Sequence, residues 1–148
     1  MLKVVIDTNL LIDGSSDDNN YGNRIIDEVI AGKISAFANR QTLQENRLIS
    51  RQKISDADYR AKLEKYFSLV RFVPRKERLN IVEDKEDNKL LESAIAADVD
   101  YLISSDQHLL KIEEYQKIKI VSPSQFWAIY EDEQGGGWRN WINSFIKT

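Results

Sequence analysis

The sequence predicts an α/β fold built around a mostly parallel central sheet. Short apolar runs alternate with longer segments of helical periodicity, an order that is typical of strands joined by helices. The first run, residues 2–6, is almost continuously apolar, as expected for a strand buried on both faces. The 148 residues, 42% hydrophobic and 30% charged, suit one domain with a real hydrophobic core.

The first half of the chain contains three predicted strands and three predicted helices. After the first strand, the polar stretch 13–23 is rich in turn formers and predicts a loop. The next helix carries its apolar residues on one face and ends at Gly32. A capping box of Ser55 and Asp58 predicts the start of the third helix. The three helices are expected over 24–32, 42–50 and 55–70, and the other two strands over 33–38 and 69–73.

The second half repeats the alternation of helices and strands. Its strongest helix, over 87–99, turns Leu90, Leu91, Ala94 and Ile95 inward. Behind it we expect a strand over 101–104, a short helical turn over 106–112, a strand over 117–121 and a helix over 122–130 with Pro123 in its first turn. Residues 1–134 are expected to form the folded domain, and residues 135–148, which begin with three glycines, a tail of the same single-domain chain.

The composition excludes several kinds of site. The chain has no cysteine and one histidine, so a metal ion would be held by oxygen atoms. No apolar run approaches the roughly 18 residues that span a bilayer, and the chain starts directly with a strand, so we expect a cytoplasmic protein without membrane contact. The formal net charge of −3 argues against a broad basic surface for nucleic acid.

Four acids follow strands or begin helices at positions that predict a shared location. Asp7 follows the first strand, and Asp106 follows the strand over 101–104. Asp87 opens the helix that leads into that second strand, and Glu45 lies in the first turn of the helix over 42–50. Because ligands of open α/β sheets bind outside the carboxyl ends of the strands, we expect these four carboxylates to converge at one edge.

A cluster of carboxylates needs a compensating charge. Carboxylates a few ångströms apart repel one another, and some would be forced to take up a proton. Mg²⁺ and Mn²⁺ prefer such oxygen ligands and often share them with phosphate groups. One or two such ions would activate a water molecule and stabilise charge on a phosphodiester. The predicted chemistry is metal-assisted hydrolysis that needs no covalent nucleophile.

Each acid also has an ordinary structural explanation. Asp7 and Asp106 are suited to capping the segments that follow them. Glu45 lies three residues after Thr42, the spacing of a capping box, and Asp87 stands where a helix dipole favours acids. These separate explanations do not account for four acids on one sheet edge.

These motifs, in this order, resemble those of PIN-domain proteins, and in particular the VapC-like toxin components of toxin–antitoxin pairs. The resemblance covers residues 2–130. It rests on Asp7-Thr8-Asn9 at the end of the first strand, on the segment that carries Glu45, and on the stretch from Asp87-Asn88 through a helix and a strand to the Ser-x-Asp motif of Ser104 and Asp106.

The resemblance implies a three-layer α/β/α sandwich and an endoribonuclease that hydrolyses single-stranded RNA with one or two Mg²⁺ or Mn²⁺ ions. It further implies a homodimer and an antitoxin partner. The metal-binding and catalytic acids carried over are Asp7, Glu45, Asp87 and Asp106, with Asp84 as an accessory. The supporting polar residues are Thr8, Asn9, Ser104 and Ser105. One departure is His108, which stands where many relatives carry another acid.

Candidate contacts to RNA phosphates come from local basic residues. Arg40, Arg47, Arg51 and Lys53 belong to the segment around Glu45, with Arg47 and Arg51 one helical turn apart. A second basic run contains Arg71, Arg75, Lys76 and Arg78, which a solvated loop would equally explain. In the tail, an apolar stripe is expected either to fold back onto the core or to dock on a second subunit or an antitoxin; it consists of Trp138, Trp141, Ile142 and Phe145.

Two other functions stay open at this stage. A phosphatase of the haloacid-dehalogenase type also opens with an Asp after its first strand, but it needs a second Asp where this chain has Asn9. A catalytically silent module that binds RNA or protein is favoured by His108 and by the negative net charge.

Overall fold

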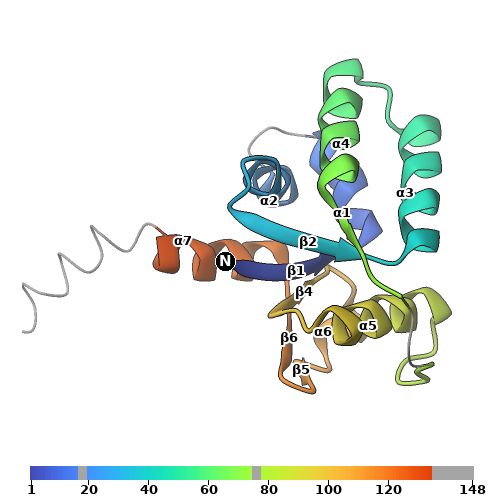
Figure 1. Ribbon diagram of the computed structural model, residues 1–148, viewed down its shortest axis with the longest axis vertical. Helices are drawn as coiled ribbons and strands as arrows, with labels where there is room; N and C mark the ends of the chain where they lie inside the picture. Colours follow the sequence, from blue (N-terminus) through green and yellow to red (C-terminus); the bar gives the residue numbers. More distant parts are fainter. Residues whose placement is uncertain (17–19, 75–77, 135–148) are drawn as a thin grey trace, which may run out of the picture.

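A six-stranded sheet separates two layers of helices in the computed structural model, which describes residues 1–16, 20–74 and 78–134 (Figure 1). The strands are β1 Leu2–Ile6, β2 Ile34–Ala38, β3 Arg71–Phe72, β4 Tyr101–Ile103, β5 Glu114–Tyr115 and β6 Ile118–Val121. The α-helices are α1 Thr8–Asp13, α2 Tyr21–Ile30, α3 Arg40–Lys53, α4 Ala57–Leu69, α5 Lys85–Ala97, α6 Gln107–Leu110 and α7 Pro123–Gln134, with a short 3₁₀ helix, η1, over Gly14–Ser16.

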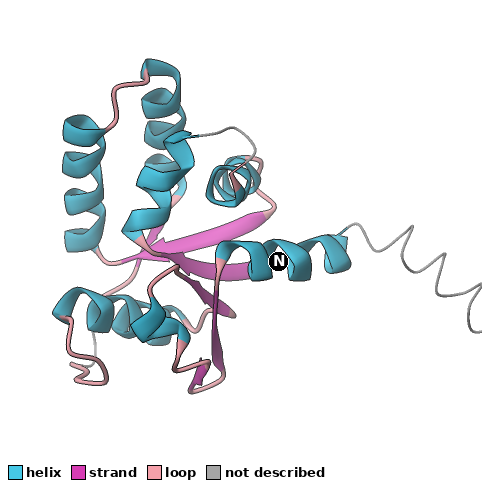
Figure 2. Ribbon diagram, turned by 180° about the vertical axis from the view of Figure 1, so that it is seen from behind, coloured by secondary structure: helices cyan, strands magenta, loops and turns pink. Residues whose placement is uncertain are grey.

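The strand order is β3-β2-β1-β4-β6-β5, and the pairs are parallel except for the edge hairpin of β5 and β6. Figure 2 shows the same sheet from behind, with helices on both sides of it. The sequence-based expectation of a three-layer sandwich with a mostly parallel sheet is therefore confirmed. Since β1 and β4 pair at the centre, the residues that follow them emerge side by side.

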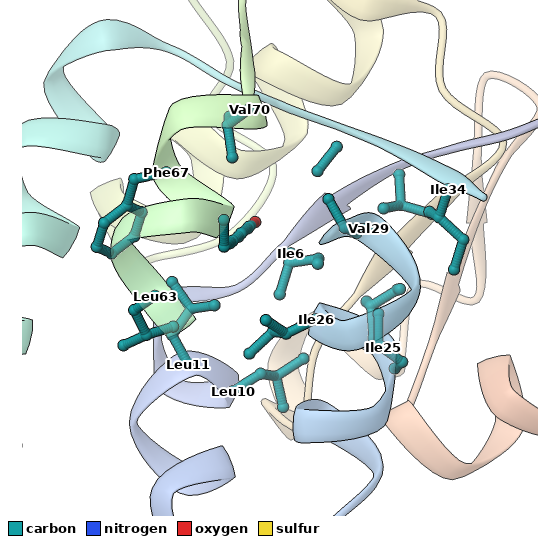
Figure 3. Packing of buried hydrophobic residues seen from close by; sticks show 14 of the residues in the cluster. Ile6, Leu10, Leu11, Ile25, Ile26, Val29, Ile34, Leu63, Phe67 and Val70 are labelled. Atoms are coloured by element: carbon teal, nitrogen blue, oxygen red, sulfur yellow. The ribbon is translucent and has the colours of Figure 1, made fainter. Parts of the chain in front are cut away.

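One face of the sheet is covered by α1, α2, α4 and α7. Val4 and Ile6 of β1 belong to the apolar cluster of this layer. Figure 3 shows Ile6 among Leu10, Ile26 and Leu63. The amphipathic pattern of α2 places its apolar residues on the side that meets the sheet, as the sequence predicts. This apolar cluster, the larger of the two, packs these helices against the sheet.

The opposite face is covered by α5 and α6. Val5 of β1 and Leu102 of β4 point to this side, because successive strand residues alternate between faces, and they pack against Leu91 and Leu109. A strand that supplies buried side chains to both layers must be apolar throughout. The unbroken apolar run at residues 4–6 thus reflects the central position of β1.

Two helix starts differ from the sequence-based expectation. Asp56, and not Ser55, caps α4: its carboxylate accepts hydrogen bonds from the backbone N–H groups of Asp58 and Tyr59. Asn39 caps α3 by accepting from the N–H of Thr42, so the proposed Thr42–Glu45 capping box is wrong. Both errors arose because several polar residues in a row satisfy the same capping pattern.

Three segments also differ in extent. The stretch 13–23 was expected to be a loop, but its described residues include the end of α1, η1 and the start of α2, capped by Asn20. The strand expected over 69–73 is reduced to β3, since α4 continues to Leu69. Strand β5 was not expected, because Gln116 and Lys117 form its turn at positive φ, where Gly or Asn is usual.

The helix expected over 122–130 begins at Pro123 and extends to Gln134. Ser122 Oγ accepts from the Gln125 N–H, while the Gln125 side chain accepts from the Ser122 N–H, which closes a reciprocal cap. The tail 135–148 and its apolar stripe lie outside the described residues. Among residues 1–16, 20–74 and 78–134, no helix is long and apolar enough to cross a membrane.

Candidate metal centre

The carboxyl ends of β1 and β4 bring two of the predicted acids to one place. Ile6 and Ile103 are partners in the parallel ladder, and the next backbone N–H, that of Asp7, donates to the Ile103 carbonyl over 3.0 Å. The residues that leave β4 lead from Ser104 to Asp106, which caps α6. Asp7 and Asp106 therefore leave neighbouring strands at the same edge of the sheet.

Asp7 is nearly buried and is held by two hydrogen bonds. Its Oδ1 atom accepts from the Asn9 N–H over 3.2 Å, which makes Asp7 the N-cap of α1. Its Oδ2 atom accepts from the hydroxyl of Ser104 over 2.7 Å. Capping does not prevent this side chain from binding a metal ion, because each hydrogen bond uses one lone pair and the carboxylate has others.

Ser104 connects the two acids. It is fully buried, and while its hydroxyl donates to Asp7, its Oγ atom accepts from the Asp106 N–H over 3.0 Å. The Oδ1 atom of Asp106 accepts in turn from the His108 N–H over 2.7 Å. Ser104 therefore fixes the separation of Asp7 from the turn that carries Asp106. Ser105, the alternative hydroxyl, is exposed and does not line the pocket described below.

Helix α5 contributes further acids from its first turn. Asp84 is the N-cap and accepts from the Glu86 N–H over 2.8 Å, so the helix begins at Lys85, two residues before Asp87. Asp87 is only 6% exposed, and its Oδ2 atom is buried without any hydrogen-bond partner. From the sequence, Asp84 is expected only as an accessory, and Glu86 is not expected at the site.

Helix α3 contributes Glu45. The sequence predicts this residue in the first turn of its helix, but α3 begins at Arg40, so Glu45 lies in the second turn. Thr42, Glu45 and Ile49 follow the three- and four-residue spacing of one helix face, and all three line the pocket. On the neighbouring side, the buried amide oxygen of Asn46 accepts from the Thr8 hydroxyl over 2.5 Å. This bond ties α3 to the residue that follows Asp7.

The four predicted acids meet in one pocket, which we call the acidic pocket. It has a volume of about 230 Å³ and contains no basic side chain in its lining. Six of its lining residues are acidic: Asp7, Glu45, Asp84, Glu86, Asp87 and Asp106. The others are Thr8, Asn9, Thr42, Ile49 and Leu90.

Burial and mutual repulsion change the acidity of this pocket. Desolvation raises the pKa of Asp87 to about 7, with further increases from the charges of Asp106, Asp84 and Asp7. The pKa of Asp7 is also raised, chiefly by desolvation, although the hydrogen bond from Ser104 opposes this change. Near neutral pH, the acidic side chains of the pocket therefore carry negative charge, and no basic side chain in the lining compensates it.

This arrangement fits a divalent cation. An unpartnered, buried carboxylate oxygen such as Oδ2 of Asp87 is costly unless something pairs with it. Hard oxygen donors without cysteine or lysine suit Mg²⁺ or Mn²⁺. Within the described part of the chain, however, no three His, Cys, Asp or Glu side chains are close enough together to hold one ion as they stand.

Comparisons with known proteins are consistent with this geometry. A family model described as PIN domain matches residues 3–108, which is most of the chain. The chain belongs to the PIN domain family. The haloacid-dehalogenase alternative is thereby set aside. A search of curated protein sequences finds no match.

The fold of this PIN domain is also similar to a solved structure described as VapBC2 from Rickettsia felis bound to a DNA fragment from their promoter. The TM-score is 0.55 at 12% sequence identity, and the similarity covers 82% of this chain and 98% of the other. At that identity the likeness supports the fold alone.

The predicted RNA-binding arginines lie outside the acidic pocket of the PIN domain. The guanidinium of Arg47 lies 5.7 Å from the ring centre of Phe67 on α4, and that of Arg40 lies 5.3 Å from the ring of Phe72. Arg51 is exposed in the last turn of α3. Their contact with RNA stays a prediction. In the second basic run, residues 75–77 are outside the described residues.

Proposed function

We propose that the acidic pocket is the catalytic centre of a Mg²⁺- or Mn²⁺-dependent endoribonuclease that hydrolyses single-stranded RNA. The observation that carries this proposal is the buried, unpartnered oxygen of Asp87 in a PIN-domain pocket that is lined by six acidic side chains and by no Lys, Arg or His. A binding site for RNA alone would be expected to present cations to the phosphates. A pocket of the opposite charge makes sense when a cation mediates the contact.

The ion would be held by Asp7, Asp87 and Asp106, with Glu45 as a fourth donor. When bound, Mg²⁺ or Mn²⁺ supplies a Lewis acid and lowers the pKa of a coordinated water molecule. Because no three of these groups in the described part of the chain stand in range of one point, binding of the ion requires the side chains of Glu45 and Asp106 to rotate inward toward Asp7 and Asp87. The exposed or partly exposed positions of Glu45 and Asp106 leave room for such rotation.

The chain's own residues provide position and rigidity. Asp7 is fixed by Ser104 and by its place at the end of a central strand, and Asn9 holds its second oxygen atom through a backbone N–H. Thr8 and Asn46 keep the helix that bears Glu45 beside this point. Rigid placement of donors removes the entropy that a mobile side chain would lose on binding.

The test is cleavage of a 5′-labelled single-stranded RNA in Mg²⁺, in Mn²⁺ and in EDTA. The matched variants are Asp7→Asn and Asp58→Asn; Asn is still able to cap α1, and Asp58 is an exposed acid on α4. We expect metal-dependent cleavage by the wild type and by Asp58→Asn, and a loss of roughly 100-fold or more in Asp7→Asn, since even residues behind a metal ligand often cost 10–100-fold.

Other results separate the alternatives. Metal binding without any cleavage would favour the silent RNA- or protein-binding module. Cleavage of equal rate in Asp7→Asn and the wild type would show that the acidic pocket is not the catalytic centre.

We further propose that the protein acts as the toxin of a toxin–antitoxin pair and forms a homodimer. The support for the toxin role and the antitoxin partner is the similarity of its fold to the VapBC2 structure. The homodimer is proposed from the resemblance to the VapC-like group. Co-purification with the product of a small neighbouring gene, and loss of RNA cleavage in that complex, is the expected result. Light scattering of the isolated protein tests the dimer, and a monomer at all concentrations would contradict it.

A further inference from the structure

We infer that a second pocket, beside the acidic pocket, binds a nucleotide of the single-stranded RNA next to the phosphate that is cleaved. This inference rests on the proposed function. The second pocket, which we call the side pocket, is lined by Ile81, Val82, Glu83, Asp84, His108 and Lys111. Asp84 lines both pockets, so they share a wall.

The volumes of the two pockets suit different parts of an RNA strand. Pockets that enclose small molecules measure roughly 300–1,000 Å³. The acidic pocket, at about 230 Å³, falls below this range and suits a phosphate group with an ion and water. The side pocket, at about 470 Å³, falls within it and has room for a base and a sugar.

The chemistry of the side pocket also suits a nucleotide. His108 and Lys111 are the basic residues among the linings of the two pockets, and they lie three positions apart at α6. Neither side chain forms a hydrogen bond or ion pair with another described residue, so Lys111 is available to a phosphate and the imidazole ring of His108 to a base. Ile81 is 44% exposed and offers an apolar surface to a base.

The loop that forms the far wall is held in place by α5. Asn88 is buried, and its amide oxygen accepts from the N–H groups of Ile81 and Val82 over 3.0 and 3.1 Å. The Asn88 amide nitrogen donates to the Val82 carbonyl over 2.8 Å, and the buried Glu92 accepts from the Leu79 N–H. Helix α5 thus positions Asp87 for one pocket and, through the next residue, the wall of the other.

The test measures RNA binding without cleavage. Fluorescence anisotropy gives the Kd of a labelled hexa-adenylate for the full chain with Ca²⁺ in place of Mg²⁺, over a series of salt concentrations. The variants are Lys111→Ala, His108→Ala and His108→Phe. The matched control is Lys65→Ala, which removes an exposed lysine of α4, on the opposite face of the sheet.

We expect Lys111→Ala to weaken binding about three- to tenfold and to reduce the slope of log Kd against log salt by about 0.7, the value for one phosphate contact on a single strand. We expect His108→Ala to weaken binding about fivefold or more and His108→Phe to restore most of it, because an aromatic ring still stacks on a base. Lys65→Ala should match the wild type.

Three results would overturn the inference. The first is that Lys111→Ala and His108→Ala bind as Lys65→Ala does. The second is no measurable binding of hexa-adenylate by the wild type. The third is equally tight binding of free 5′-AMP at the side pocket, which would indicate a site for free nucleotides and not for a strand.

Failure of this inference is distinguishable from failure of the proposed function. If the wild type cleaves RNA with Mg²⁺ while the His108 and Lys111 variants bind normally, the side pocket has another role and the nuclease proposal stands. If hexa-adenylate binding depends on Lys111 but no cleavage occurs, the RNA subsite stands and the nuclease proposal fails.

Discussion

Asp87 makes the stability of the metal-free protein depend on pH. Its pKa is about 7 in the folded chain, against an ordinary value of 3.8, because burial and the charges of Asp106, Asp84 and Asp7 disfavour the ionised form, while His108 opposes the change. Between these two pH values the folded chain binds a proton that the unfolded chain has lost. The free energy of unfolding therefore decreases as pH rises from about 4 to about 7.

The size of this effect follows from the difference in pKa. One unit of difference is worth about 1.4 kcal/mol, so ionising Asp87 costs the fold up to about 4 kcal/mol above pH 7. Asp87→Asn removes the charge, but it places an amide N–H₂ where the unpartnered oxygen was. The buried, unpartnered amide lowers the free energy of unfolding by about 1–3 kcal/mol at every pH. The variant should be destabilised near pH 4 and stabilised by about 1–3 kcal/mol near pH 8.

Thermal unfolding in EDTA at pH 4, 6 and 8 measures this difference. At about 2–4 °C per kcal/mol for a chain of this size, the melting temperature of Asp87→Asn relative to the wild type should rise by roughly 10 °C from pH 4 to pH 8. The exposed Asp58→Asn variant should follow the wild-type curve. If the curves of Asp87→Asn and the wild type are parallel, the buried charge of Asp87 does not control stability and the electrostatic account of the pocket is wrong.

Three further predictions concern metal binding, the Ser104 hydrogen bonds and the hydrophobic core. Mg²⁺ or Mn²⁺ at pH 8 should raise the melting temperature of the wild type and leave that of Asp87→Asn nearly unchanged, since binding to the folded state alone stabilises it; an equal rise in both would place the ion elsewhere. Ser104→Ala leaves the buried Asp7 carboxylate and the Asp106 N–H without their partner, and should lower the free energy of unfolding by about 2–3 kcal/mol in urea titrations, whereas a loss below 0.5 kcal/mol would contradict the bridging role. Leu63→Ala removes a fully buried side chain of the larger cluster and should cost about 2–5 kcal/mol, against a near-zero cost for exposed Leu69→Ala.

The central sheet was predictable because its buried strands require apolar runs that are visible in the sequence. The run Val4-Val5-Ile6 is apolar on both faces since β1 contributes to both clusters, and helix α5 carries a clear apolar face. Strand β5 has no such apolar run. It is two residues long, and its turn uses Gln116 and Lys117 at positive φ, residues that the turn preferences do not suggest.

The candidate site was predictable to the extent that it depends on strand ends. Asp7 and Asp106 follow directly from the pairing of β1 with β4. Glu86 and the Thr8–Asn46 contact were missed because they depend on the starts of α5 and α3, which depend in turn on which of several adjacent polar residues is the cap. With the start of α5 known, the four-residue spacing between Glu86 and Leu90 would have placed Glu86 on the helix face that lines the pocket. The roles of all these residues as ligands stay predictions.

The central claim is that the acidic pocket holds a divalent ion that is used to cleave RNA. Mn²⁺ binding, followed by electron paramagnetic resonance at pH 8 in the samples used for RNA cleavage, tests it most directly. We predict that the wild type and Asp58→Asn bind Mn²⁺ and cleave in proportion to its occupancy, and that Asp87→Asn loses both. Full Mn²⁺ occupancy and undiminished cleavage in Asp87→Asn would contradict the claim.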